Sequence, residues 1–143
     1  MNACVLDASV AAKWLLPPAG ETLVPEARRL LRDYVDGRLC IVVPDLFWLE
    51  VANLLWTSIR RGRISLGSAG EALREIERRN FPTLPSQPLL EEAFTMAAAF
   101  DRTVYDAVYV ALAVVSHAPL ITADERLANA LAARAPVRWL GGL

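Results

Sequence analysis

The chain contains few of the residues from which zinc and disulfide sites are built. Among its 143 residues there is one histidine, His117, and there are two cysteines, Cys4 and Cys40. No Cys-x-x-Cys pair occurs, which excludes zinc-finger and thioredoxin-type sites, and two cysteines do not form a disulfide framework. Both cysteines lie in apolar runs, so we expect both to be buried as small hydrophobic residues.

Strong positive charge and glycine-rich phosphate loops are absent as well. The net charge is −1 and Lys13 is the only lysine, whereas domains that coat nucleic acid through bulk electrostatics are usually strongly basic. Neither Gly-x-Gly-x-x-Gly nor Gly-Lys-Ser/Thr occurs, which excludes the usual nucleotide cradles. An enzyme with a local arginine rim around an acidic centre remains compatible with this composition.

No uncharged run is long enough to span a membrane. The longest, 107–123, contains His117 and Pro119 and is shorter than a bilayer requires. No positive stretch precedes a long apolar one at the start of the sequence, so we expect no signal peptide and a cytoplasmic protein. With 55% apolar and 22% charged residues, residues 1–143 are predicted to form a single domain with a sizeable core.

Short apolar runs alternate with longer segments of helical pattern. The runs at 3–7, 40–43, 119–122 and 137–140 have the length and composition of strands that are buried on both faces. Helices are expected at 9–15, 23–36, 45–61, 68–79 and 88–100, with two more that open at Thr103 and Asp124. The helix at 68–79 is predicted from the capping-box spacing of Ser68 and Glu71. This alternation predicts an α/β fold, a three-layer sandwich with a mostly parallel central sheet.

Four acidic residues lie at strand exits or in helices beside them, and none has an obvious basic partner nearby in sequence: Asp7, Glu50, Asp106 and Asp124. Asp7 ends the first predicted strand and Asp124 follows the third. Ligands of open α/β sheets bind outside the carboxyl ends of the strands, which places both residues at one edge.

Each acidic residue also has a structural explanation. Asp7 and Asp124 could be helix N-caps, and Asp106 suits the first turn of a helix that Thr103 caps. Glu50 is harder to explain in this way, because it lies beside the apolar face of its helix without a Lys or Arg within one turn. The local patterns leave both interpretations open.

The four residues taken together favour a metal site. Two carboxylates about 5 Å apart repel by roughly 3 kcal/mol at an effective dielectric near 20, so a cluster of them requires raised pKa values or a bound cation. Oxygen ligands without His or Cys select Mg²⁺ or Mn²⁺ over zinc. The chemistry that follows is phosphodiester hydrolysis by a metal-activated water.

With these residues in view, the sequence resembles the PIN-domain family, and within it the VapC-type toxins. The resemblance rests on Val-Leu-Asp-Ala-Ser-Val (5–10), Pro-Asp-Leu-Phe-Trp-Leu-Glu-Val-Ala-Asn-Leu-Leu (44–55), Tyr-Asp-Ala-Val-Tyr-Val-Ala-Leu-Ala (105–113) and Leu-Ile-Thr-Ala-Asp-Glu-Arg-Leu (120–127). These motifs occur in the family's order and extend over most of the chain, while 62–100 is less diagnostic.

The resemblance implies a metal-dependent endoribonuclease that is the toxin of a type II toxin–antitoxin system. It places Mg²⁺ or Mn²⁺ on Asp7, Glu50, Asp106 and Asp124 as catalytic and metal-binding residues, with Glu125 as an alternative to Asp124. Ser9 and Thr122 would orient carboxylates or substrate. The implied partners are an RNA substrate, a small antitoxin protein and a second copy of the chain in a homodimer.

RNA contacts would then fall to arginines, because lysine is so scarce. Arg60, Arg61 and Arg63 are the candidates, and their alternative role is that of cations at a helix C-terminus.

The sequence also bears on three other functions. An aspartyl phosphatase of the haloacid-dehalogenase type needs a second Asp two residues after Asp7, and position 9 is Ser. A catalytically silent binding module would be expected to lack one of the four acidic residues. The sequence does not exclude a PIN-like RNA-processing nuclease without an antitoxin.

Overall fold

A five-stranded sheet forms the centre of the molecule. In the computed structural model, which describes residues 1–143, the strands lie in the order β3-β2-β1-β4-β5 and all four pairings are parallel. Their bounds are Ala3–Leu6 (β1), Cys40–Pro44 (β2), Thr83–Leu84 (β3), Leu120–Thr122 (β4) and Val137–Trp139 (β5). The predicted parallel α/β sheet is confirmed.

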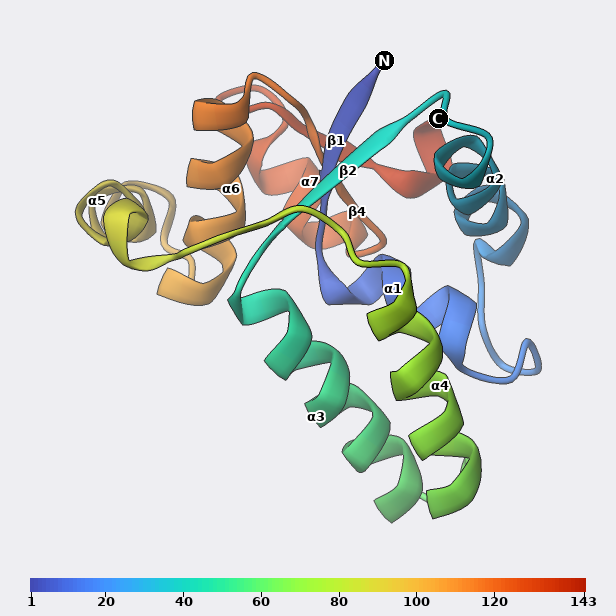
Figure 1. The fold of residues 1–143 in the computed structure, drawn as a ribbon. Coiled ribbons are helices and arrows are strands. Elements are labelled where there is room, and N and C mark those ends of the chain that lie inside the picture. Colours follow the sequence, from blue (N-terminus) through green and yellow to red (C-terminus); the bar gives the residue numbers. More distant parts are fainter.

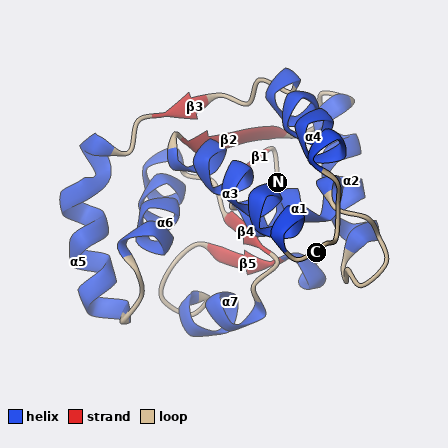
Figure 2. Ribbon diagram, turned by 90° about the horizontal axis from the view of Figure 1, so that it is seen from below, coloured by secondary structure: helices blue, strands red, loops and turns tan.

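Seven α-helices surround this sheet. They are α1 (Ala8–Leu15), α2 (Val24–Val35), α3 (Leu46–Arg60), α4 (Leu66–Arg78), α5 (Leu90–Phe100), α6 (Val104–Ser116) and α7 (Glu125–Leu131), with short 3₁₀ turns at Gln87–Leu89 and Leu140–Gly142. Helices α5 and α6 lie on one side of the sheet and α1, α2 and α4 on the other (Figures 1 and 2), which gives the expected three layers. Helices α3 and α4 pack side by side and extend beyond the sheet (Figure 1).

The apolar runs of the sequence form the core. Val5, Ile41 and Ile121 in three adjacent strands are fully buried, as expected for parallel strands that are covered on both faces. The segment 107–113 of α6 is buried throughout, and α6 packs on β1, β2 and β4. Because α6 is apolar on nearly all sides, its single carboxylate, Asp106 in the first turn, is conspicuous.

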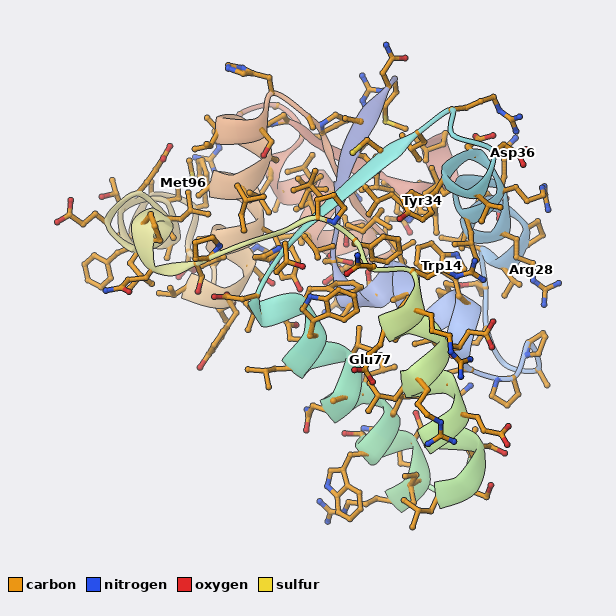
Figure 3. The ribbon with its side chains drawn as sticks, viewed as in Figure 1. Trp14, Arg28, Tyr34, Asp36, Glu77 and Met96 are labelled. Atoms are coloured by element: carbon orange, nitrogen blue, oxygen red, sulfur yellow. The ribbon has the colours of Figure 1, made fainter.

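An aromatic cluster fixes α1, α2 and α3 against each other. The Phe81 ring lies 5.0 Å from that of Tyr34 and about 6 Å from those of Trp14, Phe47 and Trp48, centroid to centroid. Trp14 and Tyr34 point into the interior, whereas Arg28 on α2 points outwards (Figure 3). Two of the helices that this cluster fixes, α1 and α3, carry residues of the candidate site.

Two sequence-based predictions of local structure were wrong. Strand β3 was not predicted, because a two-residue strand has no periodicity to recognise; Thr83 is identified only by its pairing with Val43 of β2. Helix α4 begins at Leu66 and not at Ser68, because the hydroxyl of Ser65 caps it by accepting from the Ser68 amide at 3.1 Å. The other helix bounds agree with the sequence pattern to within two residues.

The cysteine prediction was half right. Cys4 in β1 is buried, and burial raises the pKa of its thiol to about 12. Cys40 is exposed, because it is the first residue of β2 and points away from the core. Separately, none of the helices combines the length and the apolarity that crossing a membrane requires.

Candidate active site

Asp7 lies where β1 ends and α1 begins, at the carboxyl edge of the sheet. Its side chain caps α1 by accepting from the Ser9 amide at 3.1 Å, and it also accepts from the Ser9 hydroxyl. Burial raises the pKa of Asp7 to about 6; the hydroxyls of Ser9 and Thr122 oppose that shift, and the charge of Asp106 adds to it. The capping role and the perturbed carboxylate therefore coexist in one residue.

Ser9 and Thr122 connect the exits of β1 and β4. The Ser9 hydroxyl accepts from the Ala123 amide at 2.9 Å and lies 3.4 Å from the Thr122 hydroxyl. The Thr122 hydroxyl accepts in turn from the Asp124 amide at 3.0 Å. These bonds fix the two strand exits relative to each other, so that Asp7 and Asp124 share one rigid edge.

Glu50 projects from the second turn of α3 toward the same edge. Burial raises its pKa, the Tyr109 hydroxyl partly counters that shift, and the charges of Asp7 and Asp106 reinforce it. Glu50 Oε1 is buried without a hydrogen-bond partner, and so is the Tyr109 hydroxyl. The two groups thus face each other closely enough to interact electrostatically, but not in hydrogen-bond geometry.

Asp106 and Asp124 form the outer part of the edge. Thr103 caps α6 by accepting from the Asp106 amide at 3.1 Å, which leaves the Asp106 carboxylate free of that role. Burial raises the pKa of Asp106, Arg102 lowers it and the Asp124 charge raises it. Asp124 is the N-cap of α7 and accepts from the Leu127 amide at 3.2 Å.

The four acidic residues are electrostatically coupled but do not form a closed ligand group. The charge of Asp106 acts on Asp7, the charges of Asp7 and Asp106 act on Glu50, and the charge of Asp124 acts on Asp106. No salt bridge involves any of the four residues. At the same time, no three acidic, His or Cys side chains approach closely enough to form a metal-binding group. The structure therefore brings the residues to one edge without the tight convergence that the sequence suggested.

The donor set nonetheless fits a hard divalent cation. Every candidate ligand is a carboxylate oxygen, the type that Mg²⁺ and Mn²⁺ prefer. The unpartnered buried oxygen of Glu50 is an unsatisfied acceptor in the acidic centre, and a buried acceptor without a donor is costly unless a cation or water satisfies it.

We call the part of the sheet edge that carries Asp7, Glu50, Asp106 and Asp124 the acidic edge. A cleft leads away from it toward basic residues. It has a volume of about 380 Å³ and its polar lining comprises, among others, Ser9, Lys13, Glu21, Arg61, Arg63 and Asp124. Of the three arginines predicted as candidates for RNA contacts, Arg61 and Arg63 line the cleft and Arg60 does not.

Two residues of this region were not singled out from the sequence. Tyr109 lies three residues after Asp106, so helical periodicity places both on one face of α6, which is the signal that could have indicated it. Glu21 lies in the loop between α1 and α2, and nothing in its local pattern indicates that it contacts Lys13 and Arg63.

An all-parallel α/β sheet with carboxylates at its carboxyl edge is the arrangement in which α/β enzymes bind their ligands. Comparison with known proteins specifies the class of enzyme further. The model of the PIN domain family matches residues 4–131.

Named relatives agree with that match. Ribonuclease VapC3 of Pyrobaculum aerophilum is 37% identical over 127 residues, which cover 87% of this chain and 92% of the relative. Ribonuclease VapC1 of Mycobacterium tuberculosis is 32% identical over 130 residues, which cover 91% of this chain and 92% of the relative. The chain therefore belongs to the PIN-domain family, whose ribonucleases generally depend on divalent metal.

Solved structures share the fold. The crystal structure of PAE2754 from Pyrobaculum aerophilum matches with a TM-score of 0.70 and 22% identity, over 99% of this chain and 85% of that one. A toxin–antitoxin complex from Klebsiella pneumoniae matches with a TM-score of 0.59 and 16% identity, over 94% of this chain and 95% of the matched chain. At these identities the likeness concerns the fold.

Proposed function

We propose that this protein is an endoribonuclease that hydrolyses RNA phosphodiester bonds with Mg²⁺ or Mn²⁺, and that it is the toxin of a type II toxin–antitoxin pair. Membership of the PIN-domain family and relatives named as VapC ribonucleases support the proposal. The observation that carries it is the pair Asp7 and Glu50, two carboxylates with raised pKa values at the carboxyl edge of the sheet and no cationic partner.

In this proposal Asp7, Glu50, Asp106 and Asp124 hold the metal. The chemistry that a bound cation would supply there is Lewis-acid activation of water and of the scissile phosphate. Ser9 and Thr122 keep Asp7 oriented through the hydrogen bonds at the strand exits. We prefer Asp124 to Glu125 as the fourth ligand, because the Asp124 charge acts on Asp106 and Asp124 lines the cleft.

The proposed partners are a small antitoxin and a second copy of the chain, in the cytoplasm. Four large apolar side chains are more than 60% exposed: Leu49 on α3, Leu66 on α4, Phe94 on α5 and Tyr105 on α6. Leu49 and Tyr105 line one cleft together. Exposed apolar groups that gather on one face mark protein contacts. Light scattering of the purified protein distinguishes a monomer from the proposed homodimer.

The most direct test of the proposed function replaces Asp7 by Asn. Asn caps a helix about as well as Asp, so a purely structural Asp7 predicts little change in cleavage. We expect RNA cleavage in Mg²⁺ or Mn²⁺ to fall by roughly 100-fold or more, the range for loss of a catalytic charge or proton-transfer group. The folded protein should remain at least as stable without metal, because the buried charge is removed.

Asp45→Asn is the matched control. Asp45 is also the residue before a helix, but it is exposed, its carboxylate accepts from the Ser86 amide, and hydrogen bonds lower its pKa. Cleavage should persist in this variant. Metal-dependent cleavage of wild-type strength in Asp7→Asn would contradict the proposed function.

A further inference from the structure

Lys13, the only lysine, is neutralised within the protein although it lies beside the acidic edge. Its ammonium contacts Glu21 Oε2 at 2.8 Å, and the guanidinium of Arg63 contacts Glu21 Oε1 at 3.0 Å. The Lys13 and Glu21 side chains are only 13% and 11% exposed, while that of Arg63 is 34% exposed. We call this group the Lys13–Glu21–Arg63 triad.

The triad lies in the cleft that also contains Ser9 and Asp124. One continuous lining therefore connects the proposed catalytic edge to two cations. The volume of the cleft, about 380 Å³, falls in the range of small-ligand sites, roughly 300–1,000 Å³. Arg61 lines the same cleft, and it makes no salt bridge.

The contacts of Glu21 resemble those of a bound anion. One carboxylate oxygen accepts from an ammonium and the other from a guanidinium, which is how Lys and Arg together hold a phosphate. Burial alone would raise the pKa of Glu21, but the hydrogen bonds and charges of Lys13 and Arg63 outweigh it and lower the pKa. The carboxylate thus remains ionised and holds both cations in place.

We infer that Lys13, Arg61 and Arg63 form a subsite for an RNA backbone phosphate next to the scissile one, and that Glu21 occupies this subsite until RNA displaces it. The inference rests on the proposed function and names where the substrate strand lies. Glu21 preorganises the two cations and at the same time competes with the phosphate. Its removal should therefore strengthen RNA binding, whereas removal of a purely structural ion pair should only lower stability.

The test measures binding without catalysis. Fluorescence anisotropy of a labelled single-stranded RNA of mixed sequence is recorded in EDTA over a range of salt concentrations. We expect Glu21→Gln to bind about fivefold more tightly than wild type, the upper end of the effect of a partly exposed ion pair. Lys13→Met and Arg63→Ala should bind more weakly, each with a salt slope smaller by about 0.7, the value for one phosphate contact on a single strand.

Glu75→Gln is the matched control. Glu75 also pairs with an arginine, Arg79, but its side chain is 64% exposed and does not line the cleft. The substitution changes the net charge by the same amount, so any gain in affinity that it shares with Glu21→Gln reflects bulk charge. Glu21→Gln is nearly isosteric, and Arg63→Ala alters a side chain near the surface, so circular dichroism should show both variants folded.

The two proposals fail in different ways. The subsite is supported if Glu21→Gln alone gains affinity and both cation variants lose salt slope. It is overturned if Glu21→Gln binds RNA no better than Glu75→Gln, or if the salt slopes of Lys13→Met and Arg63→Ala equal that of wild type. Absence of metal-dependent cleavage by the wild type would instead contradict the proposed function, whatever the binding data show.

Discussion

Two carboxylates that solvent reaches only in part, those of Asp7 and Glu21, behave in opposite ways. Asp7 has hydroxyl and amide donors but no cation, and burial raises its pKa to about 6. Glu21 has an ammonium and a guanidinium as partners, and these lower its pKa against the effect of burial. Burial raises the pKa of both residues, and at Glu21 the two cationic partners reverse the direction of the net shift.

This difference separates a complete ion site from an incomplete one. At Glu21 the chain supplies the positive charge itself, and the triad satisfies both carboxylate oxygens. At the acidic edge it supplies three further carboxylates, and Glu50 Oε1 has no partner. A site of the second kind would be stabilised by a cation from solution.

The largest effect expected from this comparison concerns Glu50. We predict that Glu50→Gln lowers RNA cleavage by about 100-fold or more, because it removes a charge from the proposed metal site. Cleavage by Glu75→Gln, measured on the same labelled RNA with Mn²⁺, should match that of wild type. Equal RNA cleavage by Glu50→Gln and Glu75→Gln would show that the carboxylates of the acidic edge do not differ in function from those of the surface.

The pH dependence of stability should have opposite signs at the two carboxylates. The folded-state pKa of Asp7 lies above its ordinary value of 3.8. Its stabilising contribution is therefore present below about pH 4 and is lost as the pH rises through about 6. The two-unit difference corresponds to about 3 kcal/mol. In metal-free buffer, urea unfolding should show the advantage of Asp7→Asn over wild type growing from pH 4 to pH 7.

The contribution of Glu21 to stability should depend on pH in the opposite direction. Its folded-state pKa lies below the ordinary value of 4.5, so its contribution is present above pH 4.5 and is lost as the pH falls through the lowered value. Wild type should be more stable than Glu21→Gln at pH 7, and the gap should narrow in acid. A gap that widens in acid would contradict the assigned role of the triad.

A smaller effect is expected at Tyr109. Its hydroxyl is buried, unpartnered and turned to Glu50, so Tyr109→Phe should change the free energy of unfolding by less than about 1 kcal/mol. If the hydroxyl positions Glu50 for the metal, cleavage should fall by roughly three- to tenfold and more Mn²⁺ should be needed for half-maximal rate. An unchanged Mn²⁺ requirement would assign Tyr109 to packing alone.

The smallest difference concerns the neighbouring arginines Arg60 and Arg61. Arg61 lines the cleft and Arg60 does not. In the EDTA binding assay, Arg61→Ala should weaken RNA binding by about threefold, an effect typical of one exposed charge, and Arg60→Ala should weaken it less. The opposite order would place the RNA strand outside the cleft.

The sequence predicted the sheet and its edge because those features follow from local pattern. Apolar runs such as 40–43 indicate buried strands, and the position of Asp7 at a strand exit places it at the carboxyl edge before any coordinates are known. The exposed face of Cys40 and the two-residue strand at Thr83 were missed, because each depends on tertiary neighbours.

The site was predicted less completely than the fold. The four carboxylates were predicted to share one edge, and their charges do act on one another there. Their separation was not predicted, since it depends on how α3 and α6 pack. Glu21 was missed for the same reason: its partner Arg63 is 42 residues away in the chain. Contacts of this range leave no periodic signal in a single sequence.

The central claim is that the acidic edge needs a cation that the chain does not provide. Thermal unfolding of wild type, Asp7→Asn and Glu21→Gln with and without saturating Mn²⁺ tests it directly. At about 100 times the dissociation constant, Mn²⁺ should raise the Tm of wild type and of Glu21→Gln by about 5 °C or more, and should leave that of Asp7→Asn nearly unchanged. An equal rise in all three proteins, or a rise in none, would contradict the claim.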